Sequence, residues 1–186
     1  MAGHSKWAQI KRGKAVTDAA RSRVFSRYAR LIALESKKAS GSVSSPALAA
    51  VIARAKAANM PKDNIERAVA KGTSKDSGDL EEVVYECYGP GACAIVIAAL
   101  TDKKNRTTQE LKILLGERDI ELASPGAASW AFTRSPDGSY APNEPLLDVA
   151  GEDEEKLGAL LDALDEHEDV QTVYTNARGY ESTSSD

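Results

Sequence analysis

Cysteine, histidine and phenylalanine each occur only twice in the 186 residues, and aromatic residues make up 5% of the chain. The cysteines, Cys87 and Cys93, and the histidines, His4 and His167, are too scattered for the paired ligand spacing of a structural zinc site. Two cysteines that flank a Gly-Pro-Gly turn do not make a disulfide framework, so we expect them to be reduced. The sequence therefore predicts neither a metal nor another cofactor.

Long apolar runs are also missing. No segment approaches the roughly 20 apolar residues of a membrane span, and the basic N-terminus lacks the apolar core of a signal peptide. The same N-terminus would suit an organelle presequence, but Trp7 within the compact string GHSKW makes that the weaker interpretation. We expect a cytoplasmic protein with no membrane partner, or a mitochondrial matrix protein if the source is eukaryotic.

Recognisable catalytic patterns are absent as well. Ser5 beside His4 does not make a nucleophilic dyad, because such a pair is built in space and no third partner is evident. The chain has no G-x-S-x-G string, and its YGPG string lacks the Gly-Lys-Ser/Thr ending of a phosphate loop. The acids at 152–155 match the first turn of a helix, where the helix dipole favours carboxylates. The sequence predicts a protein that is not an enzyme.

Charge, in contrast, is abundant and unevenly distributed. The first 75 residues hold 16 Lys/Arg and 4 Asp/Glu (net +12), and the rest hold 8 Lys/Arg and 24 Asp/Glu (net −16). The change falls in the polar segment TSKDSGDLEE, which has no apolar period. The predicted layout is a basic domain over 1–75, a linker over 76–80, an acidic domain over 81–177 and a disordered tail over 178–186.

The basic half has helical periodicity. Apolar residues recur every three or four positions, which predicts helices over about 17–39, from Pro46 onward, and over about 61–72. Ser45 and Pro46 are typical of a helix start, and Gly72 is typical of a helix end. We expect these helices to form a small bundle.

The acidic half changes to the period of strands. EEVVYECYGPGACAIVIAAL predicts two strands around a turn. A helix over 105–118, strands at AASWAFTR and PLLDV, a helix at EDEEKLGALLDALDEH and a strand at DVQTVYTN follow. Without the first strand, the order is the split β-α-β-β-α-β of ferredoxin-like folds. The predicted class is α+β: a three-helix domain followed by a ferredoxin-like α/β sandwich with an extra N-terminal hairpin strand.

The basic half has the composition of a nucleic-acid-binding surface. Arg23, Arg27 and Arg30 fall within about 60° of one another on a helical wheel, and a guanidinium group can bind two phosphate oxygens. Closely spaced like charges disfavour folding unless a polyanion offsets them, and the ring of Trp7 could stack on a base. The candidate contacts are His4, Ser5, Lys6, Trp7, Lys11, Arg12, Lys14, Arg21, Arg23, Arg27, Arg30 and Lys62.

Some candidates leave alternatives open. Lys62 lies at a helix start that could receive phosphate or could simply be capped. The string TDKKNRT follows a strand predicted to be central, and it carries a basic island in the acidic half. The predicted secondary contacts are Tyr88, Lys103, Lys104 and Arg106.

Several strings follow one another in the order seen in the YebC/PmpR family. They are AGHSKWAQIK, the pattern of Asp18, Arg21 and Phe25, ANMPKDNIERA, YECYGPG, TDKKNRT and ALDEHEDVQTVYTN. The chain resembles this family, which includes probable bacterial transcriptional regulators and the mitochondrial translational activator of cytochrome oxidase subunit one. The resemblance implies a cytoplasmic, non-enzymatic protein with a helical domain, an α/β domain and a third domain inserted into the second.

The sequence departs from that family in two places. Only SPDGSYAPNE separates AASWAFTR from PLLDV, where the family carries several dozen residues of the third domain. Gly13 and Ala20 occupy positions that are often basic in related sequences. Functions that need the third domain are therefore in doubt for this chain.

Two roles are described in the family: DNA binding that alters transcription, and ribosome association that eases synthesis of difficult stretches. A basic arm with Trp7 suits irregular or single-stranded RNA, whose bases can stack on aromatic rings. A ribosome-associated translation factor is therefore our first hypothesis, and a DNA-binding transcriptional regulator is the second. The third is an interaction module whose acidic domain binds a basic protein.

Overall fold

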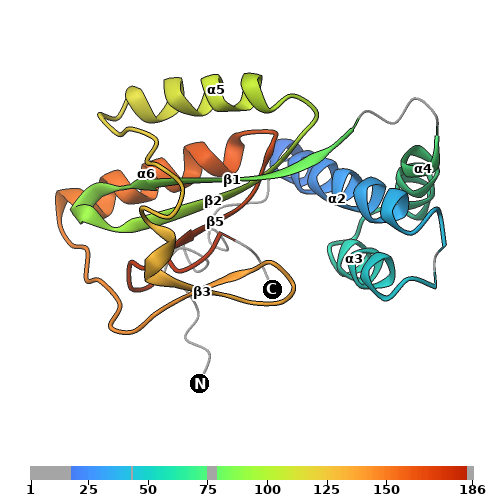
Figure 1. The fold of residues 1–186 in the computed structure, drawn as a ribbon. Coiled ribbons are helices and arrows are strands. Elements are labelled where there is room, and N and C mark those ends of the chain that lie inside the picture. Colours follow the sequence, from blue (N-terminus) through green and yellow to red (C-terminus); the bar gives the residue numbers. More distant parts are fainter. Residues whose placement is uncertain (1–17, 43, 75–78, 184–186) are drawn as a thin grey trace. The chain divides into compact units, whose positions relative to one another are not determined.

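The computed structural model describes residues 18–42, 44–74 and 79–183, which belong to two compact units (Figure 1). One unit lies within Val16–Glu81, and the other contains Glu82–Asp186. The first is helical and the second combines helices with antiparallel strands, so the predicted α+β class is confirmed. Within the described ranges, no helix is both long enough and apolar enough to cross a membrane.

The helical unit consists of α2 (Asp18–Lys38), α3 (Pro46–Ala57) and α4 (Lys62–Thr73), and α2 packs against both other helices. Their apolar residues meet in one core because each helix repeats them every three or four positions. The buried members are Ile32, Leu48, Val51, Ala55, Met60, Ile65 and Ala68. The three helices predicted from the periodicity are thus present.

Close contact between α2 and α4 depends on a glycine. A Cβ atom on the buried Gly72 would lie 2.3 Å from the carbonyl oxygen of Ala33 and 2.7 Å from the Cβ of Ser36. The hydroxyl of Ser36 donates a hydrogen bond to the carbonyl of Val69 at 2.8 Å. Gly72 lies in the last turn of α4, as predicted, and it is also buried against α2, which the sequence did not predict.

The second unit is built on a sheet in the order β1-β2-β5, formed by β1 (Glu81–Tyr88), β2 (Ala94–Thr101) and β5 (Val170–Thr175). Strand β2 is nearly all buried and runs antiparallel to β5, with Ile97 opposite Val173. Helices α5 (Lys104–Gly116) and α6 (Glu152–Glu166) contribute buried leucines to the core on one face of the sheet. Figure 1 shows both helices on the same side of the strands.

A separate hairpin packs on the other face. It consists of β3 (Phe132–Arg134) and β4 (Tyr140–Pro142), preceded by the 3₁₀ turn η2 (Ser129–Ala131). The centroid of the Tyr140 ring lies 6.3 Å from the ring centroid of Phe132 and 5.4 Å from that of Tyr174 on β5. These rings join Ala94 and Val96 of β2 in a second apolar cluster.

This arrangement corrects the predicted placement of the middle strands. AASWAFTR contains η2 and the short strand β3, and PLLDV contributes only the bridge between Leu147 and Ala177. Strand β2 already pairs with β1 on one side and β5 on the other, so no edge of β2 is left for them. The order of elements was predicted correctly, but the extra first strand displaces the middle strands from the main sheet.

The predicted disordered tail is also corrected, for residues 178–183. The backbone N–H of Thr183 donates to the carbonyl of Val173 at 2.9 Å, and Tyr180 is buried. Arg178 forms an ion pair with Asp148 at 2.7 Å. These residues pair along the outer edge of β5.

The buried carboxylate of Glu86, in β1, organises the segment before η2. It accepts backbone N–H bonds from Gly126 (2.8 Å), Ala128 (2.7 Å) and Ser129 (2.8 Å). Burial acts to raise the pKa of Glu86, but the hydrogen bonds outweigh it and lower the pKa below the ordinary value of 4.5. The charged form of Glu86 therefore fixes this segment on β1.

We expect Glu86→Gln to destabilise the second unit by about 1–3 kcal/mol, because the amide NH₂ would face backbone donors that the carboxylate now satisfies. The lowered pKa in the folded state means that the contribution is present above about pH 4.5 and is lost as the pH falls through the folded-state pKa. Urea unfolding at several pH values measures both effects. An equally steep loss of stability in acid for the variant and the parent would contradict this role.

Gly72→Ala should destabilise the helical unit by about 1–3 kcal/mol, because the added methyl group would overlap the backbone of α2. The matched control is Gly158→Ala in α6, where nothing lies within 4 Å of the added carbon. That change should stabilise α6 by about 0.5–1 kcal/mol, as alanine is the better helix former. Thermal unfolding followed by circular dichroism measures both changes. An unchanged melting temperature for Gly72→Ala would show that α2 and α4 can move apart without a loss of stability.

Candidate nucleic-acid interface

Three arginines of α2 share one side of the helix. Arg23, Arg27 and Arg30 are partly exposed, and helical periodicity places them away from Phe25 and Ile32, which pack in the bundle. The side that carries these guanidinium groups is thus distinct from the side that forms the core. We call these three residues the arginine face.

Other predicted cations of this unit have acidic neighbours. Arg21 lies 3.6 Å from Asp18, and Lys62, at the start of α4, lies 3.5 Å from Glu66 one turn later. Exposed pairs of this kind contribute at most about 1 kcal/mol, so a phosphate could replace either carboxylate. For Lys62, both phosphate binding and a purely local role at the helix start remain compatible with the geometry.

The unit offers cations that the sequence analysis counted but did not single out. Arg54, Lys56 and Lys71 are exposed, and no ion pair joins them to a carboxylate among the residues that the structure describes. Lys37, in contrast, forms an ion pair with Asp79 and lowers the pKa of that carboxyl group. The charge total of the segment was the only sequence signal for these residues.

Part of the predicted interface lies outside the described residues. These positions are His4, Ser5, Lys6, Trp7, Lys11, Arg12 and Lys14. Their role as contacts remains a prediction from the sequence.

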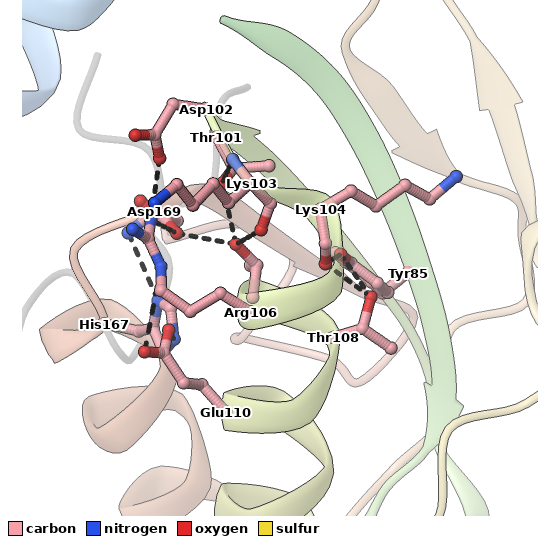
Figure 2. Close-up of polar contacts among 11 residues, drawn as sticks. Tyr85, Thr101, Asp102, Lys103, Lys104, Arg106, Thr108, Glu110, His167 and Asp169 are labelled. Carbon is pink, nitrogen blue, oxygen red and sulfur yellow. Dashed lines mark hydrogen bonds and ion pairs between the residues drawn. The ribbon is translucent and has the colours of Figure 1, made fainter.

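In the second unit, the segment between β2 and α5 is organised by the buried carboxylate of Asp169 (Figure 2). The hydroxyl of Thr107 donates to Asp169 Oδ2 at 2.7 Å, and the two Oγ1 atoms of Thr107 and Thr101 are 2.8 Å apart. The backbone N–H of Lys103 donates to Thr101 Oγ1 at 3.0 Å. The start of α5 is therefore tied to the residue that precedes β5.

Arg106 is the cation of this network. Its guanidinium group lies 2.9 Å from Asp169, 3.0 Å from Asp102 and 3.9 Å from Glu110. The hydrogen bond to Asp169, together with the attraction of that carboxylate, raises the pKa of Arg106. Arg106 is thus engaged within the protein, and its role as a secondary contact remains a prediction from the sequence.

The two lysines of the same loop are placed differently. Lys103 and Lys104 are exposed and form no ion pair with any described residue. Figure 2 shows the Lys104 side chain pointing away from the Asp169 network. They remain candidates for a secondary contact, which the network holds at a fixed position.

His167 and Glu110 complete the network, and with Asp169 they are the only described trio of such side chains close enough to share a metal ion. Their ligand atoms lie within 4.8 Å of one another. However, His167 Nδ1 accepts the N–H of Asp169 at 3.2 Å, so Nε2 carries the proton and faces Glu110 at 3.2 Å. Arg106 already supplies positive charge, so the geometry favours a structural network over metal binding.

Tyr88, the remaining secondary candidate, is 41% exposed. Its hydroxyl donates to the carbonyl of Ala127 and accepts a hydrogen bond of 2.9 Å from the Trp130 indole. Its polar end is therefore satisfied by the protein, and only its ring is available to a partner. Trp130 was not predicted from the sequence.

We expect Arg106→Gln to lower the melting temperature of the second unit by several degrees, because it leaves the buried charge of Asp169 without its cation. The matched control is the double variant Lys103→Gln/Lys104→Gln, which removes two charges from the same loop. That double variant should melt like the parent. Equal melting temperatures for Arg106→Gln and the parent would show that Asp169 does not need its partner.

Comparison with known proteins identifies relatives for both units. Residues 5–75 match the TACO1/YebC protein N-terminal domain, and residues 80–137 match the TACO1/YebC second and third domain. A structure of a conserved hypothetical protein from Aquifex aeolicus is similar, with a TM-score of 0.82 at 28% identity. That likeness covers 94% of this chain and 97% of the other.

Three relatives are each named probable transcriptional regulatory protein. The one from Leptospira biflexa is 41% identical over 191 residues, which cover all of this chain and 75% of the relative. The one from Thermotoga maritima is 46% identical over 136 residues, covering 72% of this chain and 54% of the relative.

The third relative, from Fervidobacterium nodosum, is 34% identical over 235 residues, which cover 95% of this chain and 93% of the relative. That alignment is longer than the 186 residues here, so the relative carries residues with no counterpart in this chain. The match to the second and third domain ends at residue 137, in the turn between β3 and β4. On the match of both domains and the identity to these relatives, the chain belongs to the TACO1/YebC family.

Proposed function

We propose that this protein is a nucleic-acid-binding regulator of gene expression that acts on ribosomal RNA as a translation factor. The observation that carries the proposal is the arginine face of α2. It lies within the first 75 residues of the chain, which have a net charge of +12. The names of the relatives support a regulatory role for this chain. The proposed binding part is the basic domain, 1–75, and the acidic domain takes no major share of the phosphate contacts.

RNA is preferred over DNA because of the predicted contacts around Trp7. An aromatic ring among cations suits unpaired bases, which single-stranded and looped RNA presents and duplex DNA does not. Lys103 and Lys104 add a secondary contact whose position is fixed by the Asp169 network. No step of this role requires a catalytic group, so the proposal is for a binding protein and not an enzyme.

The alternative is a DNA-binding transcriptional regulator, which the printed names of the relatives favour. Co-sedimentation with ribosomes, and filter binding to ribosomal RNA fragments and duplex DNA at one salt concentration, separate the two. The proposal expects co-sedimentation and tighter RNA binding. A protein that stays in the supernatant but prefers one promoter duplex would establish the alternative instead.

Neutralising the arginine face should weaken RNA binding and its dependence on salt. In Arg23→Gln/Arg27→Gln/Arg30→Gln, the slope of log K against log salt should fall by about 2, at about 0.7 for each lost contact to single-stranded RNA. The matched control removes three cations from the other unit: Lys112→Gln/Arg118→Gln/Lys156→Gln. If the triple arginine variant folds and keeps the parent's slope of log K against log salt, the arginine face does not contact the RNA.

A further inference from the structure

Trp130, in η2, is 68% exposed, which makes it the most exposed large apolar side chain among the described residues. Exposure alone carries little meaning, because single apolar side chains are common on protein surfaces. Trp130 differs because several contacts fix it in position. These contacts come from β1, from the preceding loop and from the residue that follows β4.

The indole is held through its polar edge. Its Nε1–H donates to the Tyr88 hydroxyl at 2.9 Å, and that hydroxyl donates to the carbonyl of Ala127. The side-chain amide of Asn143 donates to the backbone carbonyl of Trp130 at 3.3 Å. The hydrogen-bonding edge is thus used within the protein, and the apolar ring surface is what remains exposed.

A buried charge holds the backbone at the same place. Glu86 accepts the N–H groups of Ala128 and Ser129, immediately before Trp130, from a position only 6% exposed. Burial of a carboxylate is unfavourable by itself, and here the hydrogen bonds of the loop compensate for it. A ring fixed in advance loses little conformational entropy when a partner covers it, which favours binding.

The charge of the surrounding unit indicates the kind of partner. Residues 82–183 contain 8 Lys/Arg against 20 Asp/Glu, a net charge of −12. Such a unit repels a phosphate backbone and attracts cationic protein segments. Tryptophan is the best of the aromatic side chains for binding a guanidinium group over its face. The unit already contains such a contact, between Arg134 and Tyr140 at 5.8 Å.

We propose that the exposed ring of Trp130 is a docking site for an arginine side chain of a basic protein partner. Tyr88 acts as its positioning residue by holding the indole edge. The acidic unit supplies long-range attraction, and Trp130 supplies the local contact that distinguishes arginine from other cations. This interface is separate from the arginine face, so it goes beyond the proposed role in nucleic-acid binding and does not depend on it.

The test uses a peptide of eight arginines as the probe and the fluorescence of Trp130 as the signal. The chain has two tryptophans, so Trp7→Phe in the full-length protein leaves Trp130 as the sole indole. The peptide should change its emission, and a peptide of eight lysines should bind less tightly. In the same background, Trp130→Ala should weaken binding of the arginine peptide by about 5- to 30-fold, measured by calorimetry.

Three further variants make the outcome decisive. Ile113→Ala removes a side chain of α5 that is 64% exposed, and it should leave binding unchanged. Trp130→Phe keeps a ring, guards against misfolding of the alanine variant and should give an intermediate loss. Tyr88→Phe frees the indole edge and should weaken binding without removing the ring.

Two results would overturn the proposal. The first is that the arginine peptide does not bind at all, or that it binds Trp130→Ala as tightly as Ile113→Ala. Equal binding would mean that the net charge of the unit accounts for all of the affinity. The second is a single-stranded RNA that changes Trp130 emission and loses affinity in Trp130→Ala, which would assign the ring to nucleic acid. Neither result bears on the arginine face, so this proposal and the proposed function can fail separately.

Discussion

The double pairing of β2 is the constraint on which the second unit depends. Hydrogen bonds to β1 on one side and to β5 on the other leave this buried strand with no free edge. Further strands can only continue outward or pack on a face. The C-terminal residues extend the sheet outward by pairing with β5, and the hairpin β3-β4 packs on a face of the sheet. The packing of this hairpin on the sheet therefore determines where η2 and Trp130 lie.

Two buried carboxylates then fix the loops that the sheet leaves irregular. Glu86 accepts three backbone N–H groups, and Asp169 accepts hydrogen bonds from an arginine and a threonine hydroxyl. Each is an acceptor that must be paired when water is excluded, so each demands a specific conformation of the segment around it. One segment presents Trp130 and the other presents Lys103 and Lys104. In both cases a buried charge determines what lies on the surface.

The chain divides its charge between parts of opposite sign. The basic part suits phosphate, and the acidic unit suits cationic protein segments. A ribosome offers both kinds of surface, because it combines RNA with basic proteins. The two proposed interfaces are therefore compatible with one target, although each stands on its own observations.

Local patterns in the sequence predicted much of this protein. Helical periodicity gave the three helices of the first unit, the change to strand periodicity marked the second, and charge counts separated them. Those features depend on residues close together in the chain, so a linear reading can detect them. The arginine face was predicted in the same way, from the spacing of Arg23, Arg27 and Arg30.

Tertiary structure decided what depends on distant residues. Which strands pair with β2, why Gly72 cannot carry a side chain, and why Arg106 binds Asp169 63 positions away are all long-range contacts. Arg106 and Lys104 look alike in the string TDKKNRT, yet Arg106 is paired with carboxylates and Lys104 forms no ion pair with a described residue. The sequence by itself determined the elements and the distribution of charge. The fold decided which charges are paired within the protein, because ion pairing depends on distance in space and not on separation along the chain.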